Sequence, residues 1–191
     1  MLFYKDIPNH FSFDDVYDKV VREANSPATF VEIGTWFGAS AAYMAGRIKE
    51  SGKNIRFYAI DNFTAEGSSP LLQAEVAKIG GNFFALFCEN LSKCGIAEYV
   101  TPLVGDSTEM ASHFNDNSVD FAYIDACHEY RKVRLDIMAW IPKVKTGGII
   151  AGHDYNADHG GVIKAVDEVF GKGCVQIMRS SWLVKKSPEM Q

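Results

Sequence analysis

The sequence predicts an α/β fold in which helices cover both faces of a mostly parallel sheet. Strand-like runs alternate with helical patterns along the chain, and these runs are apolar on both faces, as buried parallel strands are. Two further extended runs near the C-terminus lie too close together for a parallel crossover, which needs roughly a dozen residues. We therefore expect a doubly wound, seven-stranded sheet with one antiparallel strand near the C-terminus.

The expected elements follow in chain order. Valines at helical spacing indicate a leading helix at Phe13–Ala24. Runs rich in β-branched and aromatic residues predict strands at 28–34, 55–61, 98–106, 119–125 and 147–154. Between them, the pattern predicts helices at Ser40–Glu50, Leu71–Leu91, Thr108–Phe114 and His128–Ile141. After the fifth strand come a helix at 160–171 and two strands at 174–180 and 181–186.

The length of 191 residues fits a single domain, with a leading helical segment at 1–27 and a core at 28–186. The least regular part is Asn62–Gly95, which is longer than one crossover helix requires. It forms either a lid or wall of a binding site, or two helices interrupted at Gly80 and Gly81.

Composition and charge argue against several partners. The net charge of −5 comes without a basic block, which disfavours nucleic acid and anionic membranes. No apolar run approaches the ~20 residues of a membrane helix, and the N-terminus does not look like a signal peptide. The cysteines lack metal-site spacing, which indicates reduced thiols and a cytoplasmic protein. A homodimer is left open.

Small and acidic residues gather where the first strand ends. In an open parallel sheet, ligands bind beyond the carboxyl ends of the strands. Gly34 and Gly38 let the backbone approach a ligand and turn into the next helix, although a tight turn explains them equally well. A carboxylate at Glu32 is costly in a buried strand unless it has a partner, and an amine would satisfy it.

The second and third strands also end in acids. Asp61 closes the second strand, where an acid can hold both hydroxyls of a ribose. Asp106 closes the third strand with Ser107 beside it, where the pair can meet an adenine amino group or cap the next helix.

A second group of polar residues follows the fourth and fifth strands. Asp125 and Asp154 can converge if those strands are neighbours, because adjacent strands lie ~4.8 Å apart. Paired carboxylates suit Mg²⁺, or similarly Mn²⁺ or Ca²⁺, and such an ion can lower the pKa of a substrate hydroxyl. His128 suits the role of proton acceptor, and Tyr130 can orient the substrate. Helix capping by His128 and turn capping by Asp154 are the plain alternatives.

The segments "VEIGTWFGAS", "AIDNF", "VGDS" and "VDFAYIDACHEY" resemble the successive motifs of class I S-adenosylmethionine-dependent methyltransferases, over roughly residues 28 to 186. The run from "YIDACHEY" to "GHDYNADHGG" is similar to that of small-molecule O-methyltransferases related to macrocin and other sugar O-methyltransferases. The resemblance implies a Rossmann-like sheet with a seventh, antiparallel strand, and S-adenosylmethionine as the cofactor.

The resemblance also implies roles for individual residues. Glu32, Gly34 and Gly38 would surround the methionine moiety, Asp61 the ribose, and Asp106 with Ser107 the adenine. The residues expected to bind the cofactor are Glu32, Gly34, Thr35, Trp36, Gly38, Ser40, Asp61, Asn62, Asp106, Ser107 and Asp125. Related metal-dependent enzymes carry two adjacent metal-binding residues after the fifth strand. Here His153 and Asp154 occupy those places, with Asp125 as the third metal ligand and His128, Asp125 and Tyr130 as the catalytic residues.

We therefore expect a methyltransferase that modifies a hydroxyl group of a small acceptor, such as a sugar or glycosylated metabolite. One alternative is an NAD(P)-dependent oxidoreductase, which shares a strand-end acid such as Asp61 but normally carries a G-x-G-x-x-G loop that this chain lacks. The other alternative is a catalytically silent protein that binds a cofactor or a partner.

Overall fold

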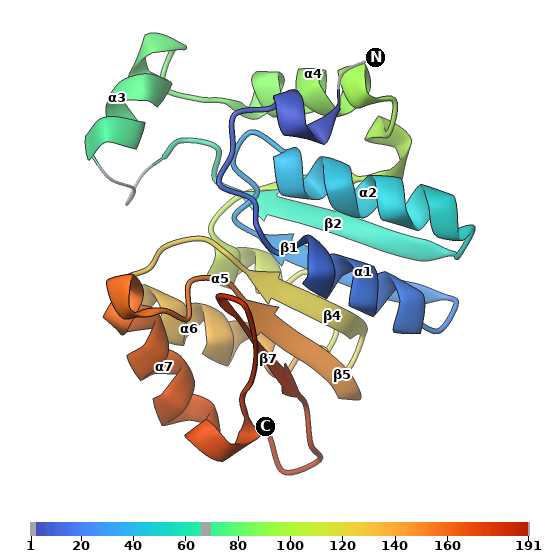
Figure 1. The fold of residues 1–191 in the computed structure, drawn as a ribbon, viewed down its shortest axis with the longest axis vertical. Helices are drawn as coiled ribbons and strands as arrows, with labels where there is room; N and C mark the ends of the chain where they lie inside the picture. The colour runs from blue at the N-terminus through green and yellow to red at the C-terminus, as the bar shows by residue number, and fades with distance from the viewer. Residues whose placement is uncertain (1–2, 66–69, 191) are drawn as a thin grey trace.

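The computed structural model describes residues 3–65 and 70–190. In this part of the chain, seven strands form one sheet in the order β3-β2-β1-β4-β5-β7-β6 (Figure 1). The strands are β1 (Ala28–Ile33), β2 (Ile55–Asp61), β3 (Thr101–Val104), β4 (Val119–Ile124), β5 (Val144–Gly152), β6 (Gln176–Met178) and β7 (Ser181–Lys185). β7 runs antiparallel to β5 and β6, and the remaining neighbours pair in parallel. The predicted sheet, with its antiparallel strand near the C-terminus, is confirmed.

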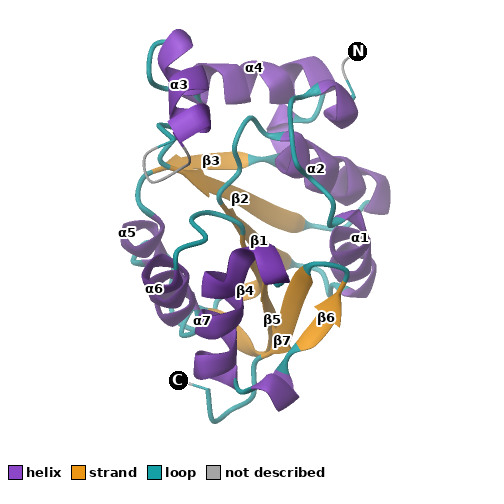
Figure 2. Ribbon diagram, turned by 60° about the vertical axis from the view of Figure 1, so that its left-hand side comes forward, coloured by secondary structure: helices purple, strands orange, loops and turns teal. Residues whose placement is uncertain are grey.

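Helices cover both faces of the sheet, as the apolar strands require (Figures 1 and 2). One face packs against α1 (Asp14–Glu23), α2 (Ala39–Ser51) and α4 (Phe84–Cys94), and the other against α5 (Ser107–Ala111), α6 (Tyr130–Trp140) and α7 (Gly160–Phe170). Phe30, Phe57 and Phe121 are register partners across three strands and all lie in the first core. The alternating residues Val31 and Ile33 lie in the second.

The long connection after β2 forms two helices rather than one. α3 (Pro70–Lys78) and α4 are separated at Gly80 and Gly81, whose φ angles of 93° and 81° favour glycine. The reading of this region as two interrupted helices is therefore confirmed for the described residues. Residues 66–69 of the connection lie outside the described part, and the alternative role as a lid stays a prediction.

Single-turn 3₁₀ helices complete the chain at Tyr4–Asp6, Ala97–Tyr99, Ala157–His159 and Lys172–Cys174. The third strand is shorter than its sequence suggested because residues 97–99 form one of these turns. β3 lies at the edge of the sheet, which explains how it accommodates Pro102. In the described ranges, no helix is both long and apolar enough to cross a membrane.

The strand order reverses between β1 and β4, because the chain runs outward from β1 to β3 and then returns to the other side of β1. Ligands of open α/β sheets bind at such a point, beyond the carboxyl ends of the strands. The backbone N–H of Asp125 donates to the carbonyl of Ile33 at 2.7 Å, so the ends of β1 and β4 are held together there. The candidate site residues follow these two strands and their neighbours.

Candidate functional site

Two groups of side chains lie at the carboxyl edge of the sheet. The first, which we call the first-loop pocket because we expect it to hold a ligand, consists of Glu32, Thr35, Ser40 and Asp61 around the loop from β1 to α2. Glu32 is 1% exposed, and its Oε1 accepts a hydrogen bond from the Ser40 hydroxyl. Its Oε2 is buried and makes no well-formed hydrogen bond among the described residues, although the buried Tyr17 hydroxyl lies close enough to lower the pKa of Glu32. Burial raises the pKa of Glu32 to about 8.

Thr35 adds a second oxygen of this kind, because its Oγ1 is buried and finds no partner in the described ranges. Buried polar atoms are nearly always paired, so an unpaired one marks a place where a ligand or water is missing. An amine can donate to Glu32 Oε2, and the N-terminal N–H groups of α2 face an acidic group favourably. The amino acid end of S-adenosylmethionine carries both groups, and this pocket fits it.

The two glycines of the loop are explained by close packing within the protein. A Cβ atom at Gly34 would lie 2.2 Å from the backbone oxygen of Asp125, and one at Gly38 would lie 2.9 Å from the Phe87 ring. Both residues also have positive φ angles, of 85° and 94°. The tight-turn explanation of these glycines is therefore sufficient, and their contact with a cofactor stays a prediction.

Asp61 connects the end of β2 to the first loop. Its Oδ2 accepts the backbone N–H groups of Thr35 at 2.9 Å and Trp36 at 3.1 Å, and its Oδ1 accepts that of Phe63 at 2.8 Å. Burial raises the pKa of Asp61, and these hydrogen bonds oppose the rise. The backbone N–H of Asn62 also approaches this carboxylate. A carboxylate has about four acceptor positions, so a ribose hydroxyl would have to share Asp61 with these backbone groups.

The adenine-side candidates have structural partners. Asp106 caps α5, accepting the backbone N–H of Thr108 at 2.9 Å, and Ser107 Oγ accepts from Trp140 Nε1 at 3.0 Å. Asn62 accepts the backbone N–H of Thr64 at 3.0 Å. The capping alternative for Asp106 is thus realised, while the contact of these residues with adenine is still to be tested.

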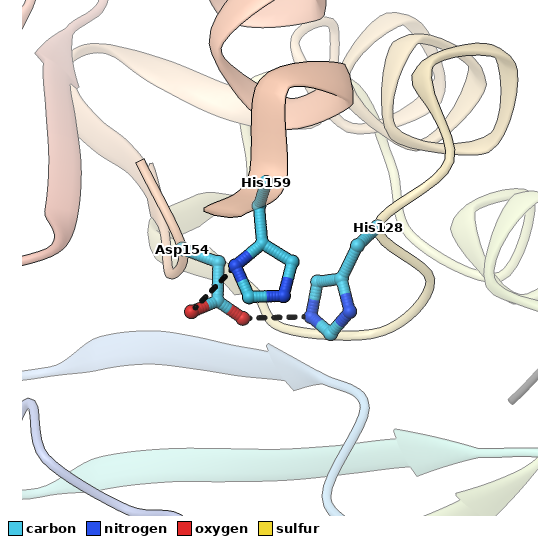
Figure 3. Close-up of side chains that lie close together, drawn as sticks. All are labelled: His128, Asp154 and His159. Atoms are coloured by element: carbon cyan, nitrogen blue, oxygen red, sulfur yellow. Dashed lines mark ion pairs between the residues drawn. The ribbon is translucent and has the colours of Figure 1, made fainter. Parts of the chain in front are cut away.

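The second group, which we call the histidine–aspartate cluster, consists of Asp125, His128, His153, Asp154 and His159. β4 and β5 are neighbours, and the two carboxylates converge as expected. The Asp154 carboxylate lies 2.8 Å from His128 Nε2 and 3.3 Å from His153 Nδ1. Asp125 Oδ1 lies 3.6 Å from His153 Nδ1 and 3.9 Å from His128 Nε2. Figure 3 shows the Asp154 carboxylate with an ion pair to each of His128 and His159.

Charge in this cluster is balanced internally. The carboxylates of Asp125 and Asp154 raise the pKa of His128 to about 9, with Asp154 at hydrogen-bonding distance and Asp125 farther away. Burial disfavours a charged His153, but the same two carboxylates outweigh it and raise the pKa of His153 to about 10. Burial also disfavours a charged Asp154, yet the two imidazoles hold the pKa of its carboxyl well below the usual range.

His153 is fixed by two hydroxyl groups that sequence reasoning missed. Its Nε2 lies 3.0 Å from the Ser12 hydroxyl and 3.0 Å from the Ser180 hydroxyl, while its Nδ1 faces the carboxylates. Such an outer contact orients an imidazole for metal binding through its other nitrogen. The donor set Asp125, His153 and Asp154 fits a divalent cation, because its ligand atoms all lie within 4.8 Å of one another.

Tyr130 and His159 are each held by contacts with neighbouring side chains. The Tyr130 hydroxyl donates to Glu168 at 2.6 Å, and Lys164 lies 4.4 Å from the centre of its ring, so this side chain is engaged with α7. A role for Tyr130 in orienting a substrate is still a prediction. His159 lies with its Nδ1 3.5 Å from Asp154 Oδ1, a contact that the sequence did not predict. Its position depends on how the start of α7 packs against the turn that carries His128, which no local motif of the sequence specified.

The strand order, the acids after β1 and β2, and the loop that leads into α2 define the Rossmann-like methyltransferase class. A family model described as "Methyltransferase domain" matches residues 31–155 of this chain. The chain therefore belongs to the methyltransferase-domain family.

A curated relative, an uncharacterized protein named y4gI from Sinorhizobium fredii, is 22% identical over 135 residues. The match covers 70% of this chain, and the chain spans 14% of the length of that relative.

Solved structures show the same fold. The O-methyltransferase NovP superposes with a TM-score of 0.70 at 17% identity, over 92% of this chain and 79% of NovP. An S-adenosylmethionine-dependent O-methyltransferase from Thermotoga maritima gives 0.63 at 16% identity, over 96% of this chain and 69% of its own. CalS11, a TDP-rhamnose 3'-O-methyltransferase of calicheamicin biosynthesis, gives 0.59 at 16% identity, over 91% and 76% of the two chains.

Proposed function

We propose that this protein transfers the methyl group of S-adenosylmethionine to a hydroxyl oxygen of a small metabolite, such as a sugar or a glycosylated compound. The observation that carries the proposal is the placement of Asp125, His128 and Asp154 at the switch point, beside a pocket in which Glu32 Oε2 is buried with no well-formed hydrogen bond among the described residues. The names of NovP and CalS11 support an oxygen acceptor, and that of CalS11 supports a sugar.

The first-loop pocket would hold the cofactor. Glu32 would accept a hydrogen bond from the amino group, which also favours the charged form of this buried carboxyl. Asp61 would accept from the ribose, and the edge formed by Asn62, Asp106 and Ser107 would border the adenine. S-adenosylmethionine supplies an electrophilic methyl group, and its other product is S-adenosylhomocysteine.

Within the histidine–aspartate cluster, Asp125, His128 and Asp154 would prepare the acceptor. The acceptor hydroxyl oxygen would form the new bond to the methyl carbon as the bond from carbon to sulfur breaks, and His128 would take the hydroxyl proton on Nδ1, because its Nε2 already faces the Asp154 carboxylate at 2.8 Å. To do so His128 must present a neutral nitrogen, and Asp125 and Asp154 then stabilise the imidazolium that forms. Tyr130, close to His128 in the chain, would contact the acceptor.

A divalent cation, Mg²⁺ or in its place Mn²⁺ or Ca²⁺, fits the set Asp125, His153 and Asp154. Bound there, it would lower the pKa of an acceptor hydroxyl. We place this activity in the cytoplasm, consistent with all four cysteines being free thiols. A homodimer is the assembly to test by light scattering.

Calorimetry with S-adenosylhomocysteine, NAD and NADP tests the cofactor. We expect binding of the sulfur compound alone; binding of NAD without a response to S-adenosylhomocysteine would establish the oxidoreductase alternative.

Incubation with labelled S-adenosylmethionine and a panel of nucleotide sugars then tests the acceptor. Chelator should abolish transfer and Mg²⁺ should restore it, and full transfer in chelator would remove the cation from the proposal. Binding without transfer to any hydroxylated acceptor would favour a silent cofactor-binding protein.

A further inference from the structure

Asp154 is surrounded by more imidazole groups than the proposed reaction uses. Besides its contact with His153, its Oδ2 lies 2.8 Å from His128 Nε2 and its Oδ1 lies 3.5 Å from His159 Nδ1 (Figure 3). The two imidazole rings are 4.6 Å apart between centroids, and one ligand atom from each of the three side chains lies within 4.8 Å of the others. His159 has no part in the mechanism above.

The backbone holds these three side chains together. A Cβ atom at Gly161 would lie 2.6 Å from the carbonyl oxygen of His128, so the start of α7 packs directly on the turn that carries His128. Asp154 has a φ of 58°, an unfavourable conformation for a residue with a side chain and one that is often found at functional sites. Asn156 Nδ2 donates to Asp154 Oδ1 at 3.3 Å and so orients the carboxylate.

The spacing suits a metal ion. Two ligands that each lie ~2.0–2.1 Å from zinc are roughly 3 Å apart, close to the separations seen here. Two imidazole nitrogens with one carboxylate oxygen favour zinc, cobalt, nickel or iron over magnesium, which prefers oxygen ligands. We propose that His128, Asp154 and His159 form a binding site for a divalent transition-metal ion, of which Zn²⁺ and Co²⁺ are the probes.

This site has a consequence for activity, and that consequence rests on the proposed function. A metal ion bound by His128 Nε2 leaves the single proton of the neutral ring on Nδ1, the nitrogen that would otherwise accept the hydroxyl proton. The same ion occupies Asp154, which the activating cation needs. Zn²⁺ would therefore inhibit methyl transfer in competition with Mg²⁺.

Metal binding can be measured on the purified protein without cofactor or acceptor. We expect calorimetry at fixed neutral pH to show Zn²⁺ and Co²⁺ binding at least ~10²-fold more tightly than Mg²⁺, following the preference of imidazole sites. The visible spectrum of bound Co²⁺ should show nitrogen ligation. His159→Ala should weaken Co²⁺ binding at least ~10-fold. Removing a residue that only orients a metal ligand already costs roughly this much, and His159 is proposed as a ligand itself. His113→Ala, a matched change at an exposed histidine, should leave it unchanged.

Two results would overturn the site. One is Co²⁺ binding no tighter than Mg²⁺ binding. The other is Co²⁺ binding that survives His159→Ala but is lost in Asp125→Asn, which would assign the ion to Asp125, His153 and Asp154.

His159→Ala should also relieve inhibition by Zn²⁺ while leaving transfer with Mg²⁺ and S-adenosylhomocysteine affinity intact. A failure of the proposed function would leave metal binding in place but show no methyl transfer, so the two failures are distinguishable.

Discussion

Glu32 and Asp154 are carboxylates at the same edge of the sheet, and the protein treats them in opposite ways. Burial raises the pKa of Glu32 to about 8, and one of its oxygen atoms makes no well-formed hydrogen bond among the described residues. Burial also disfavours the charged form of Asp154, but His128 and His153 hold the pKa of its carboxyl well below the usual range. Glu32 thus keeps an oxygen that can accept a further donor, whereas the Asp154 carboxylate is already faced by imidazole groups.

This difference indicates how each region meets a ligand. A ligand with an amino group completes the first-loop pocket without displacing a protein contact. A ligand of the cluster must instead compete with contacts between imidazole and carboxylate that already exist, such as the 2.8 Å pair of His128 and Asp154. Mutations should therefore separate the two regions into one that governs cofactor affinity and one that governs the rate of transfer.

The largest effect is expected in the cluster. His128→Ala should slow methyl transfer by ~10²–10⁴-fold, because it removes the proposed proton acceptor. S-adenosylhomocysteine affinity by calorimetry should stay near that of the unmodified protein, since His128 lies outside the first-loop pocket. His113→Ala provides the control. A parallel loss of cofactor affinity would mean that the two regions are not separable.

An intermediate effect is expected in the first-loop pocket. Asp61→Ala should weaken S-adenosylhomocysteine binding by ~1–3 kcal/mol, the usual loss when hydrogen bonds to a charged group are removed. Because Asp61 also holds the backbone N–H groups of Thr35 and Trp36, Asp61→Asn is needed beside it. Asparagine keeps one acceptor oxygen, so Asp61→Asn should bind S-adenosylhomocysteine more weakly than the unmodified protein and more tightly than Asp61→Ala. Unchanged affinity in both variants would remove Asp61 from the ribose role.

The smallest effect, taken per pH unit, concerns stability. The pKa of Glu32 rises from its ordinary value of 4.5 to about 8 in the folded protein, so between these values the folded state binds a proton that the unfolded state lacks. The free energy of unfolding should therefore fall as pH rises through this window, by at most ~1.4 kcal/mol per pH unit from this group. Glu32→Gln should flatten that slope in urea titrations, with Glu50→Gln as the exposed control. An identical slope in Glu32→Gln would show that another group carries the pH dependence.

Much of the fold was predictable because it depends on local pattern. The apolar runs that became β1, β2, β4 and β5 are continuous in the sequence, and the short gap between residues 178 and 181 permits only an antiparallel pair. The convergence of Asp125 and Asp154 followed from strand adjacency alone. The exact length of β3 did not, because the 3₁₀ turn at Ala97–Tyr99 is set by packing on α2 and α4.

The parts of the site that were missed depend on contacts between distant segments. Ser12 and Ser180 reach His153 from opposite ends of the chain, and neither stands in a recognisable motif. His159 joins Asp154 only because Gly161 lets α7 approach the turn at His128 closely. The anchoring of Tyr130 by Glu168 likewise arises from the packing of α6 on α7.

The contact of His153 with both Ser12 and Ser180 bears on how the molecule responds to cleavage. The segment before α1 and the turn between β6 and β7 are each attached to the same imidazole, and Arg179 adds a 2.7 Å contact to Asp14. A protease cut just after Ser12 would separate this serine from α1 and so weaken one of the two hydroxyl contacts of His153. Limited digestion followed by mass spectrometry would measure how readily the chain is cleaved near Ser12 and Ser180, and so how firmly these segments are held against His153.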